Sequence, residues 1–383
     1  MVKKKKDSRF KTRRGRLSII AGLVTLAVAI VIVYIFVKGG GKLDLSVIRD
    51  LGIGDSSRPA DAFVLDADRS EVVGVCDNGF CAVGKLGVTI LDKAGEEQYR
   101  DTVPMKRASV KTAGKYAAVY DIGGKTALIC NSSGVTARIS ADGEIVDASI
   151  NEAGWFTVCA QEGGGYKGSC SVYNDAGEKV FRFDSSEGYL ISAHLTDDSK
   201  SVYILTLTSA GSRIVLFNLN SEEEQWSVLI AGEVVFELKG ARSDGIRAIS
   251  DKSLTAISRS GEQNKIFDFD GKNIGGYSIQ SGQPIALLLL DYGVGTKGRL
   301  ITLTESGEIL GTMDTDRRLK DIYSAGKHVY VLWADVYEVY NTKLTETLET
   351  GGSGSARAII ARDSKETYLV DGNEAIRIDS NIK

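Results

Sequence analysis

The sequence predicts an all-β chain, an eight-bladed β-propeller that follows one N-terminal transmembrane helix, with seven blades as the alternative. Three observations lead to this prediction. Residues 17–37 form an uncharged apolar run. From Ala60 onward, short β-rich runs alternate with turns rich in glycine, aspartate and asparagine, and no helical period is evident. The last group of strands is one strand short, and a spare strand stands near the start of the same region.

The composition of the 383 residues narrows the class of protein. With 43 glycines, only 3 prolines, 5 cysteines and 25% charged residues, the chain is not collagen-like, disordered or disulfide-dense. Residues 1–16 carry nine basic side chains and one acidic side chain, which leaves 38 basic and 49 acidic side chains in the remaining 367 residues. The folded part is therefore acidic, and we expect no nucleic-acid partner.

The apolar run is long enough to cross a bilayer. As a helix, residues 17–37 would span roughly 32 Å, which matches a hydrocarbon core of about 30 Å. A cleaved signal peptide is the alternative, because Ala27-Val-Ala29 resembles a cleavage site. Seven more apolar residues and Tyr34 follow that site before Lys38, however, and the whole run exceeds the usual signal-peptide length of about 7–15 residues. We therefore predict an uncleaved anchor in contact with the lipid bilayer.

The distribution of positive charge predicts the orientation of this anchor. Basic side chains crowd residues 1–16, whereas only Lys38 and Lys42 follow the helix closely. Positive residues stay in the cytoplasm, so residues 1–16 form a basic cytoplasmic tail and the rest lies outside the cell membrane. Residues 38–58 are rich in glycine and serine and predict a linker. The extracytoplasmic propeller then occupies residues 59–383.

Two turn signatures recur in the extracytoplasmic region. One places Ala-Gly before a strand, and Gly114, Gly154 and Gly326 mark its copies at separations of 40 and 212 residues from the first. The other follows a strand, as in Asp92-Lys-Ala-Gly-Glu96 and Asn174-Asp-Ala-Gly-Glu178. Here Asp or Asn begins the reversal, and Gly supplies the positive φ that turns the chain back. A repeat of about 40–45 residues with four short strands is typical of a propeller blade.

The strand pattern divides into seven groups of four and one group of three. The four-strand groups begin near Val72, Ala108, Ile145, Leu190, Val234, Ile274 and Lys320. The last group holds strands near residues 358–360, 367–370 and 375–378. Residues 62–65 can supply the missing strand, which would pair the two ends of the domain and leave no open sheet edge. A large β-sandwich or two smaller β domains are the other architectures that this pattern allows.

Several of these features together resemble a family of clostridial membrane proteins known as a domain of unknown function (DUF5711-type). The recognisable stretches are Leu51-Gly-Ile-Gly54, Val103-Pro-Met-Lys106 and Tyr120-Asp-Ile-Gly-Gly-Lys125. The resemblance implies a membrane-anchored β-propeller and no particular chemistry. More distantly, the turns are similar to those of quinoprotein-like and WD40-like propellers. Regular tryptophans and adjacent cysteines are absent, so we expect no quinone and no other cofactor.

Few residues point to catalysis or metal binding. The only histidines, His194 and His328, have no nucleophile or carboxylate at a recognised motif spacing, so we assign no catalytic residue. Residues 268–273 offer three oxygen-bearing side chains near a glycine, but the terminal Glu of a calcium loop is missing. We therefore expect no metal site and no enzyme activity.

The cysteines suggest a structural hypothesis. Asn78-Gly79 is a preferred pair for a two-residue hairpin loop, and this register would place Cys76 opposite Cys81. An extracytoplasmic location would permit a disulfide between them. Cys159 and Cys170 flank another hairpin tip and form the second candidate pair. The alternative is that all five cysteines are small buried apolar residues.

The sequence thus favours a non-enzymatic, membrane-tethered scaffold on the outer face of the cell membrane, whose partner is another envelope protein. A binder or sensor of a small ligand, such as a cell-wall saccharide or peptide, is the alternative. That alternative predicts a concave central site lined with aromatic and carboxylate side chains. An envelope hydrolase or lyase would need convergent acid, base or metal groups that the sequence does not assemble.

Overall fold

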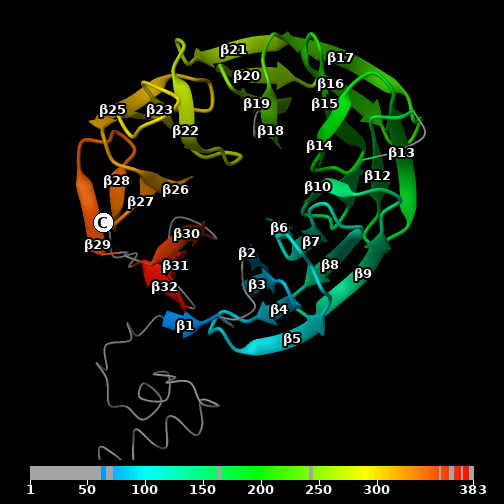
Figure 1. Cartoon of the computed structure of the whole chain (residues 1–383), viewed down its shortest axis with the longest axis horizontal. Coiled ribbons are helices and arrows are strands. Elements are labelled where there is room, and N and C mark those ends of the chain that lie inside the picture. Colours follow the sequence, from blue (N-terminus) through cyan, green and yellow to red (C-terminus); the bar gives the residue numbers. More distant parts are fainter. Residues whose placement is uncertain are drawn as a thin grey trace, which may run out of the picture. The chain divides into compact units, whose positions relative to one another are not determined.

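The computed structural model describes residues 62–65, 72–161, 165–240, 245–352, 355–361, 366–371 and 374–378. These residues form eight four-stranded antiparallel sheets arranged in a ring (Figure 1). The prediction of an eight-bladed propeller is therefore confirmed. The predicted tail, membrane helix and linker lie outside the described residues, and within the described ranges no helix is long and apolar enough to cross a membrane.

Seven blades follow the chain, each from its innermost strand outward (Figure 1). Blades 1 to 4 comprise β2 Val72–Cys76, β3 Gly79–Gly84, β4 Gly87–Leu91 and β5 Glu97–Thr102; β6 Ala108–Ala113, β7 Tyr116–Asp121, β8 Thr126–Asn131 and β9 Gly134–Ser140; β10 Ile145–Ile150, β11 Phe156–Ala160, β12 Gly168–Tyr173 and β13 Lys179–Ser185; β14 Tyr189–Leu195, β15 Ser201–Thr208, β16 Gly211–Asn218 and β17 Glu224–Ala231. Blades 5 to 7 comprise β18 Val235–Gly240, β19 Gly245–Ser250, β20 Ser253–Ser258 and β21 Gln263–Asp268; β22 Asn273–Ser278, β23 Ile285–Leu290, β24 Gly298–Leu303 and β25 Ile309–Thr315; β26 Leu319–Ala325, β27 His328–Trp333, β28 Val336–Asn341 and β29 Thr347–Gly352.

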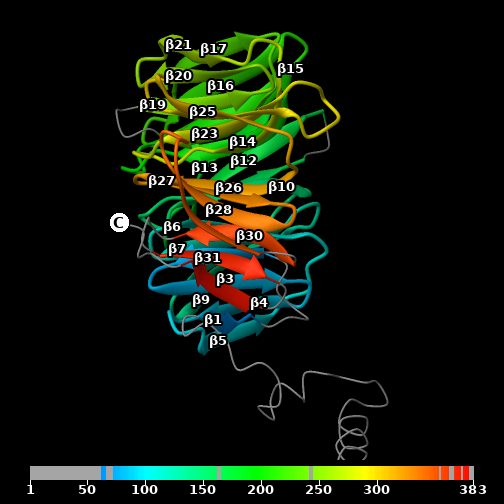
Figure 2. The same cartoon turned by 90° about the vertical axis from the view of Figure 1, so that its left-hand side faces the viewer.

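Blade 8 joins the two ends of the propeller. It holds β30 Ala356–Ala361, β31 Thr367–Asp371 and β32 Glu374–Ile378, and its outer strand is β1 Ala62–Val64. Phe63 lies opposite Ala375 in this antiparallel pair. Figure 2, turned by 90°, shows strands of blades 7, 8 and 1 following one another along the side of the ring. The strand that precedes the first complete blade thus completes the last one, as the pattern predicted.

The predicted turn chemistry is present where the chain reverses. Asp92 Oδ1 accepts hydrogen bonds from the backbone N–H groups of Ala94 at 2.8 Å and Glu96 at 2.9 Å. Gly95 in this turn has a φ of 82°, which an L side chain rarely adopts. Asn174 forms the equivalent turn in blade 3. These turns lie between the third and fourth strands of their blades and return the chain to the outer edge.

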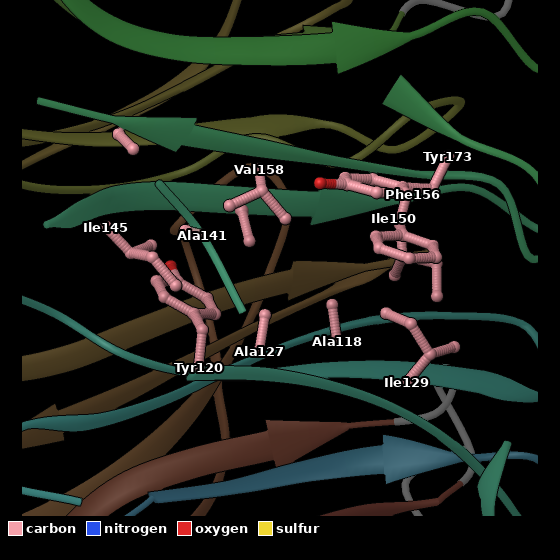
Figure 3. Close-up of a cluster of buried hydrophobic side chains, with 12 residues drawn as sticks. Ala118, Tyr120, Ala127, Ile129, Ala141, Ile145, Ile150, Phe156, Val158 and Tyr173 are labelled. Carbon is pink, nitrogen blue, oxygen red and sulfur yellow. The ribbon is translucent and has the colours of Figure 1, made fainter. Parts of the chain in front are cut away.

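A separate apolar core fills each interface between neighbouring blades. Eight buried clusters are present among the described residues, one for each blade-to-blade contact around the ring. Figure 3 shows the cluster between blades 2 and 3, where Tyr120 and Ile145 face each other across the interface. At the opposite end of the cluster from Ile145, the rings of Phe156 and Tyr173 stack with centroids 4.9 Å apart. The sheets are therefore held together mainly by side-chain packing from blade to blade.

A β-bulge recurs near the start of the innermost strand in blades 3 to 8. The register shifts between the first and third residues of the strand in blades 3, 5, 7 and 8, as between Ile145 and Asp147 in β10, and between the second and fourth residues in blades 4 and 6. The residue after the shift is an acid in three of these blades: Asp147, Glu237 and Asp321. Bulges re-aim side chains locally, so the ring places these carboxylates at equivalent positions beside its centre.

Candidate functional site

The innermost strands surround a central channel with a volume of about 1320 Å³. All eight blades contribute to its lining through their innermost strands or the turns that follow these strands. Aromatic side chains in the wall include Phe236 and Tyr323, and carboxylates include Asp147 and Glu237. The channel therefore has the concavity and the side-chain types that a small-ligand site requires.

One side of the channel holds a partly buried ion pair between blades 2 and 3. Lys111 Nζ on β6 lies 2.6 Å from Asp147 Oδ1 on β10, and the hydroxyl of Tyr120 on β7 donates to the same oxygen at 3.1 Å. Asp147 is only 9% exposed, whereas the Lys111 side chain is 40% exposed. The second oxygen, Asp147 Oδ2, is buried without a hydrogen-bond partner among the described residues. An acceptor left in this state costs stability.

A second charged pair lies on β18 of blade 5. Lys239 Nζ is 3.1 Å from Glu237 Oε1, and the hydroxyl of Tyr277 on β22 donates a short hydrogen bond to Glu237 Oε2. His194 on β14 of blade 4 also lines the channel, and its Nε2 lies next to Gly240. Four consecutive innermost strands thus contribute two lysines, two carboxylates and one imidazole, which we call the channel belt (Lys111, Asp147, His194, Glu237 and Lys239).

Burial and neighbouring charge set the protonation of the channel belt. Burial raises the pKa of Asp147, and this effect exceeds the opposing influence of Lys111 and Tyr120. Burial is the largest single influence on Lys111 and lowers its pKa, but the charges of Asp147, Tyr120 and Glu237 and the hydrogen bond to Asp147 together outweigh it, so the pKa rises. Burial, then Lys239 and Lys111, lower the pKa of His194 to about 4. At neutral pH Lys111 is therefore an ammonium group and His194 a neutral imidazole. Counted by side-chain type, the two lysines of the belt balance its two acidic residues in formal charge.

The belt is suited to binding by hydrogen bonds and charge. An ammonium group has three N–H donors, and Lys111 and Lys239 each have one side-chain acceptor assigned above, so both keep donors for a ligand. Neutral His194 offers one donor and one acceptor. Within the described ranges, no three His, Cys, Asp or Glu side chains gather closely enough to hold a metal ion.

Sequence reasoning missed most of this belt. Lys111 and Asp147 are 36 residues apart, and no short motif contains both. One signal could have found the carboxylates, namely an acid at the third position of the innermost strand in three blades. The sequence singled out His194 only as a histidine with no nucleophile or carboxylate at a recognised motif spacing, and it did not place this residue in a channel. That no catalytic residue is assigned stays a prediction.

A second cavity, of about 860 Å³, lies between blades 5 and 6. Its apolar lining includes Phe267, Phe269 and Leu289. Five aspartates and three basic side chains also line it: Asp268, Asp270, Asp291, Asp314 and Asp316, with Lys272, Lys297 and Arg299. Lys272 pairs with Asp291 at 2.8 Å and Arg299 pairs with Asp314 at 2.7 Å. Apart from these two pairs, the lining holds three aspartates and one lysine, so the cavity is acidic.

The loop of residues 291–297 borders this second cavity at both of its ends. Between those ends, Tyr292 is 72% exposed and Val294 is 92% exposed, more than any other large apolar side chain that the structure describes. We call the second cavity together with this loop the 5–6 face. Asp268, Asp270 and Asn273, the residues that resembled a calcium loop, belong to its turn, where Asp268 Oδ1 accepts from the Asp270 backbone N–H at 2.9 Å.

The proposed pairing of Cys76 with Cys81 is wrong in its register. The hairpin loop is Asp77-Asn78 rather than Asn78-Gly79, so Cys76 lies opposite Gly79 and Cys81 opposite Gly74. Asp77 adopts a φ of 54°, and its backbone N–H donates to Gly114 O of blade 2 at 3.0 Å. A contact with the neighbouring blade therefore fixes the turn one residue earlier than the local sequence preference suggests.

The second cysteine pair is aligned as expected but is not bonded. Cys159 and Cys170 are direct partners in the register of β11 and β12. All five cysteines are buried free thiols in this structure. The alternative that they serve as small apolar core residues is thus the arrangement in this structure. Burial, followed by the neighbouring Cys130 and Asp77, raises the pKa of Cys76 to about 12.

Two stretches that carried the family resemblance meet in space. Asp121 Oδ1 accepts hydrogen bonds from the backbone N–H groups of Lys106 at 2.9 Å and Arg107 at 2.7 Å. The Asp121 side chain also lies so close to Gly124 that a Cβ there would be 2.3 Å from Oδ2. The residues from 103 to 125 therefore form one structural unit at the entry to blade 2, and Tyr120 in the same unit reaches the channel belt.

Comparisons with known proteins agree with this architecture. A model described as a family of unknown function (DUF5711) matches residues 64–378. Sqt1 from Saccharomyces cerevisiae is similar with a TM-score of 0.63 at 12% identity, over 83% of this chain and 97% of that chain. BamB from Moraxella catarrhalis is similar with a TM-score of 0.56 at 14% identity, over 83% and 96% of the two chains.

The C-terminal WD40 domain of Sif2 is also similar, with a TM-score of 0.51 at 13% identity over 73% of this chain and 80% of that chain. At such low identities these likenesses concern the fold alone, and they agree with the expected similarity to WD40-like propellers. No curated protein matches the chain.

Proposed function

The chain belongs to the family of unknown function DUF5711, and we propose that it is a non-enzymatic interaction scaffold that docks another envelope protein on its 5–6 face. Propellers are suited to this role because their sheets are rigid and their loops vary. The feature that supports docking here is the second cavity, which stands beside the two most exposed large apolar side chains of the described residues.

The chemistry of the 5–6 face indicates what a partner should present. Tyr292 and Val294 would be covered by an apolar segment, as happens in the centre of many interfaces. Asp270 and Asp316 are exposed carboxylates that line the cavity. A partner with a basic side chain beside its apolar segment would match both features, because complementary charge favours encounter and fixes orientation.

We further propose that residues 17–37 tether the propeller to the outer face of the cell membrane. The support is the length of the apolar run and the excess of basic residues before it. A tether confines the 5–6 face to the membrane vicinity, so the partner would be another envelope component. Protease digestion of intact spheroplasts tests the orientation: the propeller should be degraded while the tail of residues 1–16 remains protected.

Docking can be tested with the full-length chain in its native membrane. We would cross-link cells that produce the wild type, the double variant Tyr292→Asp/Val294→Asp, or the control Ile309→Asp, which changes an exposed apolar residue at the other end of blade 6. Quantitative mass spectrometry of the purified complexes should reveal a partner that the double variant loses at least about tenfold and that the control retains. A partner profile that is the same for all three chains would refute docking at this face.

The charge complementarity has its own test. Asp270→Asn/Asp316→Asn should weaken capture of the same partner and should reduce the sensitivity of capture to salt, because exposed charges are screened as ionic strength rises. Unchanged capture and salt dependence would contradict a basic partner segment and would leave only the apolar contact.

A further inference from the structure

We infer that the central channel binds a small zwitterion, a free amino acid or a short peptide that carries both an ammonium group and a carboxylate group. The binding groups are the channel belt, Lys111, Asp147, His194, Glu237 and Lys239. This site is separate from the 5–6 face, since none of the residues that line the second cavity lines the channel.

The acceptor side of the site is Asp147. Its Oδ1 is saturated by Lys111 and Tyr120, whereas Oδ2 is buried and has no partner in the described part of the chain. Buried polar atoms are almost always hydrogen-bonded, so this oxygen calls for a donor. Lys111 pairs with the other oxygen, Oδ1, and its side chain is 40% exposed and carried on a flexible stem, so it can move to admit a ligand. A ligand ammonium group would then supply the missing donor and keep a positive charge beside Asp147.

The donor side consists of Lys239, Lys111 and His194. All three side chains line the same channel, and His194 Nε2 lies beside Gly240, the residue that follows Lys239. After the larger effect of burial, both lysine charges lower the pKa of His194. A carboxylate placed near this ring would accept hydrogen bonds from the free ammonium protons of the lysines and from the imidazole N–H. The neutral state of His194 lets it contribute a donor without adding a third positive charge.

The balance of charge favours a zwitterion over a simple anion or cation. The belt contains two basic and two acidic side chains, which balance each other. A bound simple anion or cation would add one net charge to this partly buried site, and that charge would have no counterpart. A ligand with both charges leaves the net charge of the site at zero. The channel volume of about 1320 Å³ exceeds the roughly 300–1,000 Å³ of typical small-ligand sites, so a peptide of a few residues has room in it.

The test uses full-length protein in detergent micelles and isothermal titration calorimetry. The probes are the twenty free amino acids and free tripeptides of the form Ala-X-Ala with small, apolar, acidic and basic central residues. We expect at least one probe to bind with a Kd below about 1 mM. N-terminal acetylation of that probe and C-terminal amidation of it should each weaken binding at least about tenfold. Absence of binding by every free probe, or equal binding of the capped forms, would overturn the inference.

Variants assign the binding to the channel belt. Asp147→Asn keeps the shape of the side chain and should weaken the free probe more than its acetylated form, while Lys239→Met should weaken the free probe more than its amidated form. Lys297→Met, at the second cavity, serves as the matched control and should bind as the wild type does. Thermal unfolding of each variant checks that it is folded. Wild-type affinity in both channel variants would place the ligand elsewhere and refute the site.

The outcome is independent of docking at the 5–6 face. The double variant Tyr292→Asp/Val294→Asp should bind the peptide probe with wild-type affinity even though it loses its partner. A loss of both activities in this variant would mean that the two sites are not separate, which contradicts the inference as stated.

Discussion

Removal of the Phe63 side chain should open the ring at its point of closure. Phe63 on β1 is 8% exposed, and its ring centroid lies 4.6 Å from that of Phe80 in blade 1 and 5.8 Å from that of Tyr368 in blade 8. Phe80 and Tyr368 also contact each other in an edge-on arrangement at 5.0 Å. These three rings therefore join the first strand of the propeller to the last blade and to the first complete blade.

The magnitude follows from what the substitution removes. Truncation of a buried Phe to Ala usually costs about 3–5 kcal/mol, and an aromatic pair adds about 0.5–1.5 kcal/mol. β1 has only three residues, so the surrounding chain can relax or β1 can detach, which limits the loss. We therefore expect Phe63→Ala to lower the free energy of unfolding by about 3 kcal/mol. Val64→Ala is the matched control, because Val64 is the next residue and is 43% exposed.

Urea unfolding combined with hydrogen exchange and mass spectrometry measures both effects. Phe63→Ala should raise exchange in β32, which loses its outer neighbour β1, and then in the adjacent β31, before it raises exchange in blades 3 to 5. Val64→Ala should change the stability by less than about 0.5 kcal/mol. If Phe63→Ala is as stable as the control, or if exchange increases uniformly around the ring, then ring closure at β1 contributes no local stability and the prediction is refuted.

Three further predictions concern the channel, a turn and the thiols. The folded-state pKa of His194, about 4, lies below its unfolded value, so the stability that it contributes is complete above pH 6.5 and is lost as pH falls toward 4. Free energies of unfolding from urea titrations at pH 7 and pH 5 should differ by up to about 2 kcal/mol, and His194→Gln should reduce that difference. Gly124→Ala should destabilise blade 2 by about 1–3 kcal/mol, because the added Cβ would lie 2.3 Å from Asp121 Oδ2. Thermal unfolding measures this loss, and wild-type stability would show that Asp121 can move without cost. Thiol titration of denatured, unreduced protein should count five free thiols, and a count of three or fewer would contradict the structure.

The blade count was predictable from sequence because its signals are local. A turn such as Asp92-Lys-Ala-Gly-Glu96 needs only its own side chain and a glycine at positive φ, and both are visible as letters. The ring closure was also predictable, since one strand was spare and one blade incomplete. In each case the chemistry of a few consecutive residues decides the structure.

The cysteine register shows where local reasoning ends. Asn78-Gly79 has the preferred composition for a hairpin loop, yet Gly79 is already part of β3, where a Cβ would lie 1.9 Å from Leu91 O. That glycine serves close packing within the blade rather than the turn. Asp77 instead adopts the positive φ that the turn requires, and its backbone N–H donates a hydrogen bond to Gly114 O of the next blade. The decisive contacts join residues 37 positions apart, beyond the reach of a turn rule.

The channel belt was hidden from sequence for the same reason. Its members lie on four different strands, and each of them alone reads as an ordinary charged residue in a strand. Only the ring geometry brings them together, and only the bulges turn Asp147 and Glu237 toward their partners. The acidic residues at the third position of β10 and β18 could have been noticed in the sequence. Their role becomes apparent only when it is known which strand of each blade is innermost.

The pairing of β1 with β32 constrains how the protein is made. During synthesis β1 leaves the ribosome more than 300 residues before its partner, since Ala62 pairs with Ile376. At translation rates of about 5–20 residues per second, that interval lasts roughly 15–60 s. Throughout it Phe63 has no complete pocket, and the growing row of blades has two open edges. A chain that terminates about ten residues early would never supply β32, so its first strand would remain an unpaired edge, available to other chains.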